Sequence, residues 1–589
     1  RSDDACVAVN PRGARSSAMP AATHDRALAS MVNERFKLHG LSLMGDAMRA
    51  VLKHVAHVAP ATSEREAVDQ VLKTLSRTEL SSGVLQKATI ESAIERGLAE
   101  GTIEAVERGA REMDVDGGED DEGEAMTETA AAMVHSDGLT ICDAFKTKRY
   151  AYDSQRRMFD EASKTAKIES AAESKIDLYR DRFLLLQQRL SRSRQFAKPT
   201  LQTSSTEGIA ELTSIQSLLG VSKETKFIMG CLSQLEDERF YMEDLTGTVR
   251  VDLTACERSA GLFTENCIVI AQGEVRPDGV FEVMALTFPP AETRAATRNA
   301  TNALDFFGAG HILRPNELEE LAEKELERVG ERFIVLSDVW LDQPRTFDRL
   351  AKMFDAFDSQ EEDVPGLIVF MGDFTSKPFG PTHYDFRAYT EGFDKLAELL
   401  EEYPRLRQES RFVFIPGPGD PGLNAALPRP GLQSSVIGSL LEKVPRAQFA
   451  SNPAKIRYFS QDLVFFRDDL QAKMRRNCLM LPDDDKLPEI APGDEWANRP
   501  VFKHLAATMV QQAHLCPLPI TQSPIYWEYD HSLWLYPAPN CIFLGDRTEQ
   551  QSLANFEETS LANPGCFSDD GSFLLYIPAT GECSFSAVP

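Results

Sequence analysis

Three aspartates of this chain stand where an α/β protein could use them for chemistry: Asp338, Asp373 and Asp420. Each follows a short run of consecutive apolar residues, at 333–336, 367–371 and 412–415. If these runs are neighbouring parallel strands, their carboxyl ends share one edge of a sheet, which is where open α/β folds build their sites. Carboxylates at that edge are suited to holding divalent metal ions for the hydrolysis of a phosphate ester.

The three loops resemble those of the calcineurin-type dinuclear metallophosphoesterases, whose loops read D-x-H, G-D-x-x-D and G-N-H-[DE]. This chain departs from that pattern at the positions that hold the metals. Trp340 stands in place of the first histidine, Ser376 in place of the second acid, and Pro418 and Gly419 in place of the Asn-His pair. We therefore expect no catalytic residue, no bound metal and no cofactor here.

Few imidazoles are available to complete a metal site, since the α/β region from Glu331 onward contains only His383, His504, His514 and His531. We expect the three aspartates to cap helices and tie down loops. We also expect Trp340 to pack into the vacated site. An active metal-dependent phosphoesterase or nuclease is the alternative, and it requires tightly bound metal.

The elements that would position these loops are strands buried on both faces, separated by amphipathic helices. Helical spacing occurs over 347–357 and 393–400. Later apolar runs predict a second sheet packed on the first, at 463–466, 541–544 and 573–576. The predicted fold of residues 301–589 is an α/β domain of the calcineurin-like phosphoesterase type, with its site inactivated.

A small β-barrel is predicted before this domain, over residues 226–300. Five strand-like stretches alternate with turn signals, at 227–232, 239–244, 247–253, 267–275 and 279–286. Five short strands in that length predict an oligonucleotide-binding (OB) fold. Phe240 and Tyr241 lie among acidic residues, which makes them a poor stacking platform for single-stranded DNA. We therefore favour a protein contact for the barrel.

The first part of the chain has a different character. We expect a disordered leader over 1–25, an α-helical domain over 26–110 and an acidic flexible linker over 111–140. A helical segment over 141–225 is predicted to lead into the barrel. Its basic amphipathic stretch at 175–198 should pack its apolar side on the next domain and leave its arginines in solvent.

Composition narrows the function classes. The chain has 589 residues, with 63 Lys+Arg against 91 Asp+Glu and a net charge of −28, which argues against a stand-alone DNA binder. Its 10 cysteines are dispersed and include no C-x-x-C pair, which favours a reducing compartment over a disulfide framework. No apolar run approaches the roughly 20 residues of a membrane helix, so we expect no membrane contact.

An OB-like barrel joined to an inactivated phosphoesterase domain resembles the B-subunits of the eukaryotic replicative DNA polymerases, and among them the epsilon group. The stretches that carry the resemblance are 179–192, 455–482, 516–546 and 563–567. It covers roughly residues 30–589. The N-terminal helical domain, which in the epsilon group resembles the lid of AAA+ ATPases, separates the chain from the delta group, and the alpha group ranks third.

The resemblance implies a non-catalytic accessory subunit in the nucleus. In the family, the barrel and phosphoesterase domain hold the C-terminal, cysteine-rich metal-binding module of the polymerase's catalytic subunit. The N-terminal domain docks on the GINS component of the replicative helicase for leading-strand synthesis in the replisome. Further partners would be the small histone-fold subunits, with DNA reached mainly through the complex. The corresponding accessory subunit of polymerase delta or alpha, and a single-strand binding module, remain alternatives.

Overall fold

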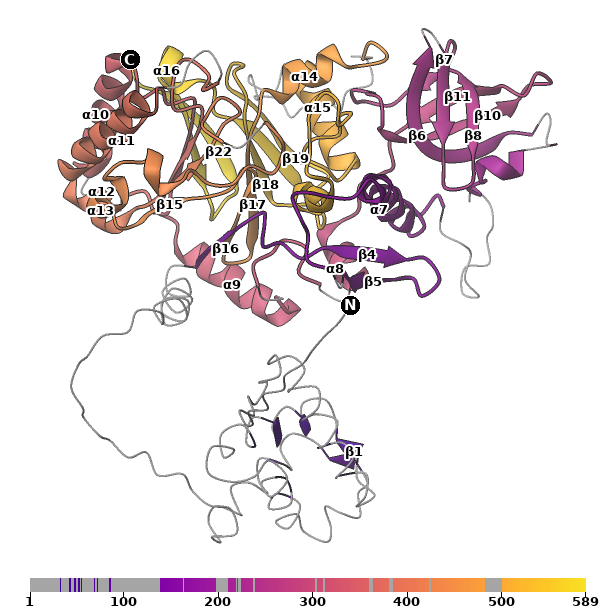
Figure 1. The fold of residues 1–589 in the computed structure, drawn as a ribbon, viewed down its shortest axis with the longest axis horizontal. Helices are drawn as coiled ribbons and strands as arrows, with labels where there is room; N and C mark the ends of the chain where they lie inside the picture. The colour runs from indigo at the N-terminus through magenta and orange to yellow at the C-terminus, as the bar shows by residue number, and fades with distance from the viewer. Residues whose placement is uncertain are drawn as a thin grey trace, which may run out of the picture. The chain divides into compact units, whose positions relative to one another are not determined.

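The computed structural model describes residues 138–589, with gaps at 163, 197–209, 219, 221–223, 237–238, 302–303, 311–312, 360–363, 381–384, 423–424 and 483–499. Before residue 138 it describes scattered positions only. The chain divides into two compact units, Arg1–Asp120 and Asp121–Pro589. Figure 1 shows the described elements, with labels where there is room.

In the first unit, the described positions include Val51, Val55, Val68 and Val71, which are helical and fully buried. Two short strands, β1 (Ser42–Leu43) and β2 (Val84–Leu85), pair in parallel. Most of the predicted helical domain, together with the leader 1–25 and linker residues 111–137, lies outside the described residues.

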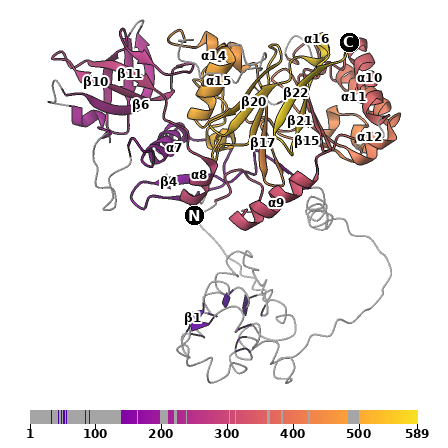
Figure 2. The same ribbon diagram turned by 180° about the vertical axis from the view of Figure 1, so that it is seen from behind.

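Two six-stranded sheets form the centre of the second unit (Figures 1 and 2). The first sheet has the order β15-β14-β13-β12-β21-β22, and the second the order β19-β20-β18-β17-β16-β3. The strands of the first sheet are β15 (Ala447–Phe449), β14 (Arg411–Ile415), β13 (Leu367–Met371), β12 (Phe333–Ser337), β21 (Ser572–Ile577) and β22 (Glu582–Ala587). The strands of the second sheet are β19 (Gln551–Phe556), β20 (Thr559–Asn563), β18 (Cys541–Gly545), β17 (Gln461–Arg467), β16 (Ala454–Tyr458) and β3 (Leu139–Cys142). The α/β architecture and a second sheet containing the runs 463–466 and 541–544 agree with the prediction. The run 573–576 was wrongly assigned to the second sheet, since it is strand β21 of the first sheet and pairs with β12.

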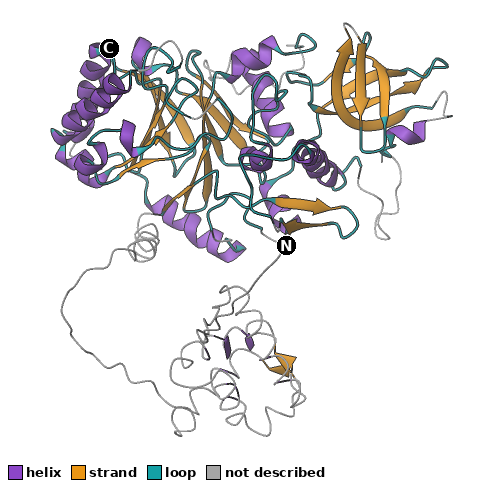
Figure 3. Cartoon of the chain, in the orientation of Figure 1, coloured by secondary structure: helices purple, strands orange, loops and turns teal. Residues whose placement is uncertain are grey.

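The two sheets pack face to face through a shared apolar layer that includes Phe333, Val369, Phe465 and Phe543. Helices α10 (Pro344–Asp358), α11 (Phe386–Glu401), α12 (Pro404–Glu409) and α13 (Leu440–Lys443) lie together beside the first sheet (Figure 3). Next to the second sheet lie α14 (Leu470–Arg476) and α15 (Pro500–Gln511). Three further helices belong to this part: α8 (Arg294–Ala300), α9 (Pro315–Glu327) and α16 (Phe567–Asp570).

The barrel forms from a separate six-stranded sheet of order β10-β6-β7-β8-β11-β9, and a further β10–β11 pairing closes it. Its strands are β6 (Lys226–Glu236), β7 (Arg239–Glu243), β8 (Thr248–Asp252), β9 (Glu257–Arg258), β10 (Ile268–Val275) and β11 (Phe281–Thr287). Its interior is apolar, with Ile228, Leu232, Val269 and Phe281 at its centre. All five predicted strands are present.

The prediction of a helical segment over 141–225 is wrong for its first part. Strand β3 joins the second sheet by antiparallel pairing with β16, and β4 (Tyr150–Asp153) forms a hairpin with β5 (Met158–Glu161). Only α7 (Glu173–Leu190) and the short 3-10 turn η1 (Ile215–Leu218) are helical among the described residues of this segment. The strands are four residues each, too short for a clear alternating pattern.

Helix α7 is fixed to the α/β domain by a buried ion pair. The Arg182 guanidinium donates to the Asp530 carboxylate at 3.0 Å, and both side chains are almost fully buried. Trp534 Nε1 donates to Asp530 at 3.0 Å, and His514 Nε2 lies 3.2 Å from it. Arg189 is also buried and donates to the Pro289 carbonyl. The expectation that the arginines of this helix are solvated is therefore wrong for these two, because they satisfy groups at the junction.

Burial makes the stability of this junction dependent on pH. It lowers the pKa values of His514 and His531 to about 4, from a usual value near 6.5. The unfolded chain therefore binds these protons more readily than the folded chain does. The stabilisation from neutral imidazoles is complete above about pH 6.5 and is lost as the pH falls toward 4.

We predict that replacing His531 with Gln removes part of this dependence. The free energy of unfolding of the wild type and of H531Q is measured by urea denaturation at pH 7.5 and pH 5.0. Between these pH values H531Q should lose less unfolding free energy than the wild type, because it takes up fewer protons on unfolding, by at most about one. Gln retains a donor for the Thr147 carbonyl, which His531 Nε2 approaches at 2.9 Å. Equal losses in both proteins would contradict the assignment.

Candidate functional site

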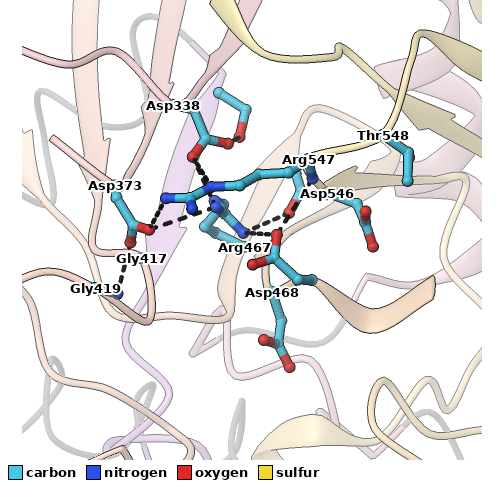
Figure 4. A network of polar contacts seen from close by, with 12 residues as sticks. Asp338, Asp373, Gly417, Gly419, Arg467, Asp468, Asp546, Arg547 and Thr548 are labelled. Atoms are coloured by element: carbon cyan, nitrogen blue, oxygen red, sulfur yellow. Dashed lines mark hydrogen bonds and ion pairs between the residues drawn. The ribbon is translucent and has the colours of Figure 1, made fainter. Parts of the chain in front are cut away.

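The carboxyl ends of four strands from two sheets meet at one place (Figure 4). Strands β12 and β13 of the first sheet lead into Asp338 and Asp373. Strand β17 of the second sheet ends at Arg467, and β18 is followed by Asp546 and Arg547. We call the group of Asp338, Asp373, Arg467 and Arg547 the closed centre.

Asp338 is fully buried and is bound by both arginines. Its Oδ1 accepts hydrogen bonds from Arg467 Nη2 at 2.8 Å and from Arg547 Nε at 2.9 Å. Its backbone has a φ of 56°, in the left-handed region that non-glycine residues rarely adopt. Such a conformation persists only where the surroundings fix it. Here the Asp338 amide donates to the Met371 carbonyl at 3.0 Å, and the Asp338 carbonyl accepts from the Ser568 amide at 3.2 Å.

Asp373 is held in the same way from the neighbouring strand. Arg547 Nη2 donates to its Oδ2 at 2.6 Å, and Arg467 Nη2 lies 3.6 Å from that oxygen. The Gly419 amide donates to its Oδ1 at 2.6 Å. Burial raises the pKa of Asp373 and the charge of Asp338 adds to this, although the two arginines oppose it.

Arg467 links the two sheets at this point and is fully buried. Its Nε donates to the Gly372 carbonyl of the first sheet, and its Nη1 to the Gly545 carbonyl of the second at 3.2 Å. The same Nη1 donates to Asp469 Oδ1 at 3.0 Å. Burial disfavours its charge, but the carboxylates outweigh this and raise its pKa further above the usual value.

Asp420 is placed beside the centre and ties two loops together. Its Oδ2 accepts from the Gly417 amide at 2.7 Å, and its Oδ1 from the Phe374 amide at 2.8 Å and from Tyr389 Oη at 3.1 Å. Burial and the neighbouring Asp373 raise its pKa to about 7. Among the described residues, neither Arg467 nor Arg547 forms a hydrogen bond or ion pair with Asp420.

The sequence positions that replace metal ligands have other contacts. The Pro418 carbonyl accepts from Arg429, and Ser376 Oγ donates to Asp342 at 2.6 Å. A side chain at Gly419 would begin 2.8 Å from Asp373 Oδ2, so this position has no room for one. The loop is therefore too close to the carboxylate for the histidine that the metallophosphoesterase pattern requires.

Trp340 does not fill the vacated site, contrary to expectation. Its backbone amide donates to Ser568 Oγ at 2.7 Å, and its ring lies beside Arg547, whose guanidinium carbon is 5.8 Å from the ring centroid. The space among the carboxylates is taken by the guanidinium groups (Figure 4). Trp340 is half-buried and packs against the guanidinium group of Arg547.

The histidines lie elsewhere. His504 Nδ1 accepts from the Gly261 amide of the barrel at 2.8 Å, while His514 and His531 are at the α7 junction and near Thr147. His383 lies outside the described residues. Among the described residues, no group of three or more His, Cys, Asp or Glu side chains is arranged to hold a metal ion. The donor set therefore does not fit a dinuclear metal centre.

Sequence reasoning missed Arg467 and Arg547, which are the main cations of this centre. Arg467 directly follows the apolar run 463–466, and Arg547 follows the run 541–544 after two intervening residues. The three aspartates follow apolar runs in a similar way. An arginine in that place is the signal that would have indicated carboxylates neutralised by the chain itself.

Comparison with known proteins agrees with this architecture. The family model for the B-subunit of DNA polymerases alpha and epsilon matches residues 333–554. The model described as DNA polymerase epsilon subunit 2-like, OB-fold domain, matches residues 172–290, which include α7 and the barrel. The DNA polymerase epsilon B-subunit of Arabidopsis thaliana is 38% identical over 558 residues, covering 95% of this chain and 98% of that protein.

This chain belongs to the DNA polymerase epsilon B-subunit family. DNA polymerase epsilon subunit 2 of Homo sapiens is 31% identical over 564 residues, covering 94% of this chain and 97% of that protein. The epsilon B-subunit of Schizosaccharomyces pombe is 31% identical over 431 residues, covering 72% of each chain. The similarity to the epsilon B-subunits therefore spans both units of the chain. No helix among the described residues is long and apolar enough to cross a membrane.

For this member of the epsilon B-subunit family, we predict that Arg467→Ala lowers the unfolding free energy by about 3–5 kcal/mol, because it leaves buried carboxylate charge uncompensated. Adding Asp338→Asn should recover part of that loss, since it removes one of the stranded charges. Guanidinium denaturation measures both. Arg387→Ala, at a side chain that is 90% exposed, is the control and should leave the midpoint unchanged. A loss in R467A no larger than in the control would contradict the role of Arg467.

Proposed function

We propose that this chain is a non-catalytic accessory subunit of the nuclear DNA polymerase epsilon complex. It holds the C-terminal, cysteine-rich metal-binding module of the catalytic subunit and tethers the polymerase to the replicative helicase during leading-strand synthesis. The observation that supports this most directly is the closed centre, in which Arg467 and Arg547 form ion pairs with the carboxylates of Asp338 and Asp373.

A dinuclear phosphoesterase needs two metal ions about 3.5–4 Å apart, with ligand oxygens and nitrogens free to bind them. Here both strand-end carboxylates are already paired with guanidinium groups, whose positive charge also repels a cation. We propose that the phosphoesterase site is inactive and that it binds no metal. On this proposal none of the positions of the degenerate motif is catalytic: Asp338, Trp340, Asp373, Ser376, Pro418, Gly419 and Asp420.

A scaffold role is supported by the way the barrel is fixed to the phosphoesterase domain. His504 accepts from the Gly261 amide, Thr508 Oγ1 from the Leu262 amide at 2.8 Å, and Thr264 Oγ1 donates to the Pro517 carbonyl at 2.8 Å. These buried contacts hold two domains in one arrangement, which suits a subunit that presents a composite surface. The net charge of −28 is consistent with DNA being held by the larger partner.

The N-terminal part of the chain serves, on this proposal, as the connection to the helicase. The domain over 26–110 docks on GINS, and the acidic linker over 111–140 keeps that domain near the polymerase at a high effective concentration. The small histone-fold subunits complete the assembly. DNA is contacted mainly through the complex.

Co-expression with the C-terminal region of the same species' catalytic subunit tests this proposal. We expect the two chains to co-elute at a one-to-one ratio from a size-exclusion column, with all bound zinc assigned to the partner when each is expressed alone. The C-terminal regions of the delta and alpha catalytic subunits are the matched controls and should not co-elute. Elution of this chain alone, or with the delta or alpha region, would contradict the assignment.

A further inference from the structure

Ser359 ends helix α10 on the surface of the second unit. Its backbone amide donates to the Asp355 carbonyl at 3.1 Å, which makes it the C-cap of the helix. The other side of α10 is anchored in the apolar core beside the first sheet through Leu350, Met353 and Phe354. Ser359 itself is exposed. Figures 1 and 2 show α10 at the end of the second unit that lies away from the barrel. The helix therefore presents this serine to solvent at a fixed place.

The hydroxyl group of Ser359 is weakly held. Among the described residues it makes one contact, in which Oγ donates to the Ala356 carbonyl at 3.4 Å. A well-formed O–H···O bond measures about 2.5–3.0 Å. Ser439 is different, because its hydroxyl donates to Asp394 Oδ1 at 2.8 Å and its amide to the same oxygen at 2.7 Å. The Ser359 hydroxyl can thus turn toward a reagent at little cost, and the Ser439 hydroxyl cannot.

The sequence after Ser359 is strongly acidic. Glu361, Glu362 and Asp363 stand two, three and four positions after the serine. No other Ser or Thr of the described residues is followed by three acidic residues within the next four positions. Residues 360–363 themselves lie outside the described residues. Protein kinases select substrates partly by charge pattern, and this pattern complements a kinase whose substrate groove is basic.

Arg405 of helix α12 lies next to this serine. Its Nη1 donates to the Asp358 carbonyl at 3.2 Å, and that carbonyl belongs to the peptide bond between Asp358 and Ser359. The Leu406 amide donates to Asp358 Oδ1 at 3.1 Å, which fixes α12 to the end of α10. Arg405 Nε also lies 3.6 Å from Glu409 Oε1. A guanidinium group this close to Ser359 is within reach of a phosphate on its hydroxyl, and arginine binds phosphate through paired hydrogen bonds.

We infer that Ser359 is a phosphorylation site for a protein kinase with a basic substrate groove, and that Arg405 holds the added phosphate. The inference goes beyond the proposed function and does not depend on it. It uses the exposed and weakly held hydroxyl, the acidic residues that follow it and the neighbouring guanidinium group.

The reaction is a phosphoryl transfer from ATP. Ser359 Oγ attacks the γ-phosphorus of a magnesium-bound ATP that the kinase holds. The Oγ–P bond forms while the bond from that phosphorus to the bridging oxygen of ADP breaks, and the hydroxyl proton passes to the catalytic base of the kinase. The product group carries a charge of about −1.5 to −2 at pH 7.

Opposing charges act on a phosphate at this place. It stands at the C-terminal end of a helix and near Asp355 and Asp358, where added negative charge is disfavoured. Arg405 offsets this repulsion by charge-assisted hydrogen bonds. The protonation equilibrium of the phosphate therefore depends on Arg405, which gives that residue a measurable role.

The phosphorylation site is tested with the full-length chain, ATP, Mg²⁺ and casein kinase II, a kinase selective for serines followed by acidic residues. Peptide mass spectrometry follows the phosphate at each position. We expect phosphate on Ser359 and none on Ser439. The variant E361Q/E362Q/D363N keeps the side-chain shapes and removes three charges, so it should lower the initial rate at Ser359 by about tenfold or more. The matched control E319Q/E320Q/E323Q removes three exposed charges from α9 and should leave that rate unchanged.

Two results would overturn the assignment of the site. One is the absence of phosphate from Ser359 in the full-length chain under conditions in which casein kinase II modifies its standard peptide substrate. The other is an equal rate in the wild type and in E361Q/E362Q/D363N, because the acidic residues would then not be read by the kinase.

The role of Arg405 is tested on the phosphorylated chain by a ³¹P nuclear magnetic resonance titration. We expect the second pKa of the Ser359 phosphate to be lower in the wild type than in R405A by about half a unit or more, since an adjacent cation favours the dianion. R407A, on the same helix, is the matched control and should titrate as the wild type does. The same second pKa in the wild type and R405A would overturn the assignment of Arg405.

Discussion

The paired charges of the closed centre are the constraint on which the arrangement of the strand ends depends. Two aspartates and two arginines meet in a place where all but Arg547 are buried, and unpaired charge there would cost several kcal/mol per group. In a metallophosphoesterase, metal ions would neutralise such carboxylates. Here guanidinium groups do so, and Arg467 also donates to the carbonyls of Gly372 and Gly545. A metal ion would leave those carbonyls without these bonds, whereas the arginine joins both sheets through its several donors.

This substitution has consequences for the residues around it. The loop carrying Gly417 and Gly419 lies so close to Asp373 that a Cβ at either position would begin within 3 Å of it. The end of β17 leads directly into α14, whose first turn bonds to Asp546. The ion pairs of the closed centre and the position of α14 thus depend on the same packing.

Much of this fold could be predicted from the sequence, because its strands are buried on both faces and read as uninterrupted apolar runs. The barrel was recognisable from its short strands and turns. Strand β3 was not, since its partner β16 lies more than 300 residues away and neither shows a distinctive local pattern. The same limit applies to Arg182, which was expected in solvent and is buried against Asp530, a partner that only tertiary structure brings near.

The candidate site was predicted in part. The aspartates and the missing histidines were visible in the sequence, whereas Arg467 and Arg547 gave a weaker signal, because an arginine that follows a strand is most often solvated. The central claim is that these arginines replace the metals, and a titration of the purified chain with Mn²⁺, followed by electron paramagnetic resonance, tests it most directly. The account predicts that all added Mn²⁺ remains free in solution. Stoichiometric binding of two spin-coupled ions per chain would contradict it.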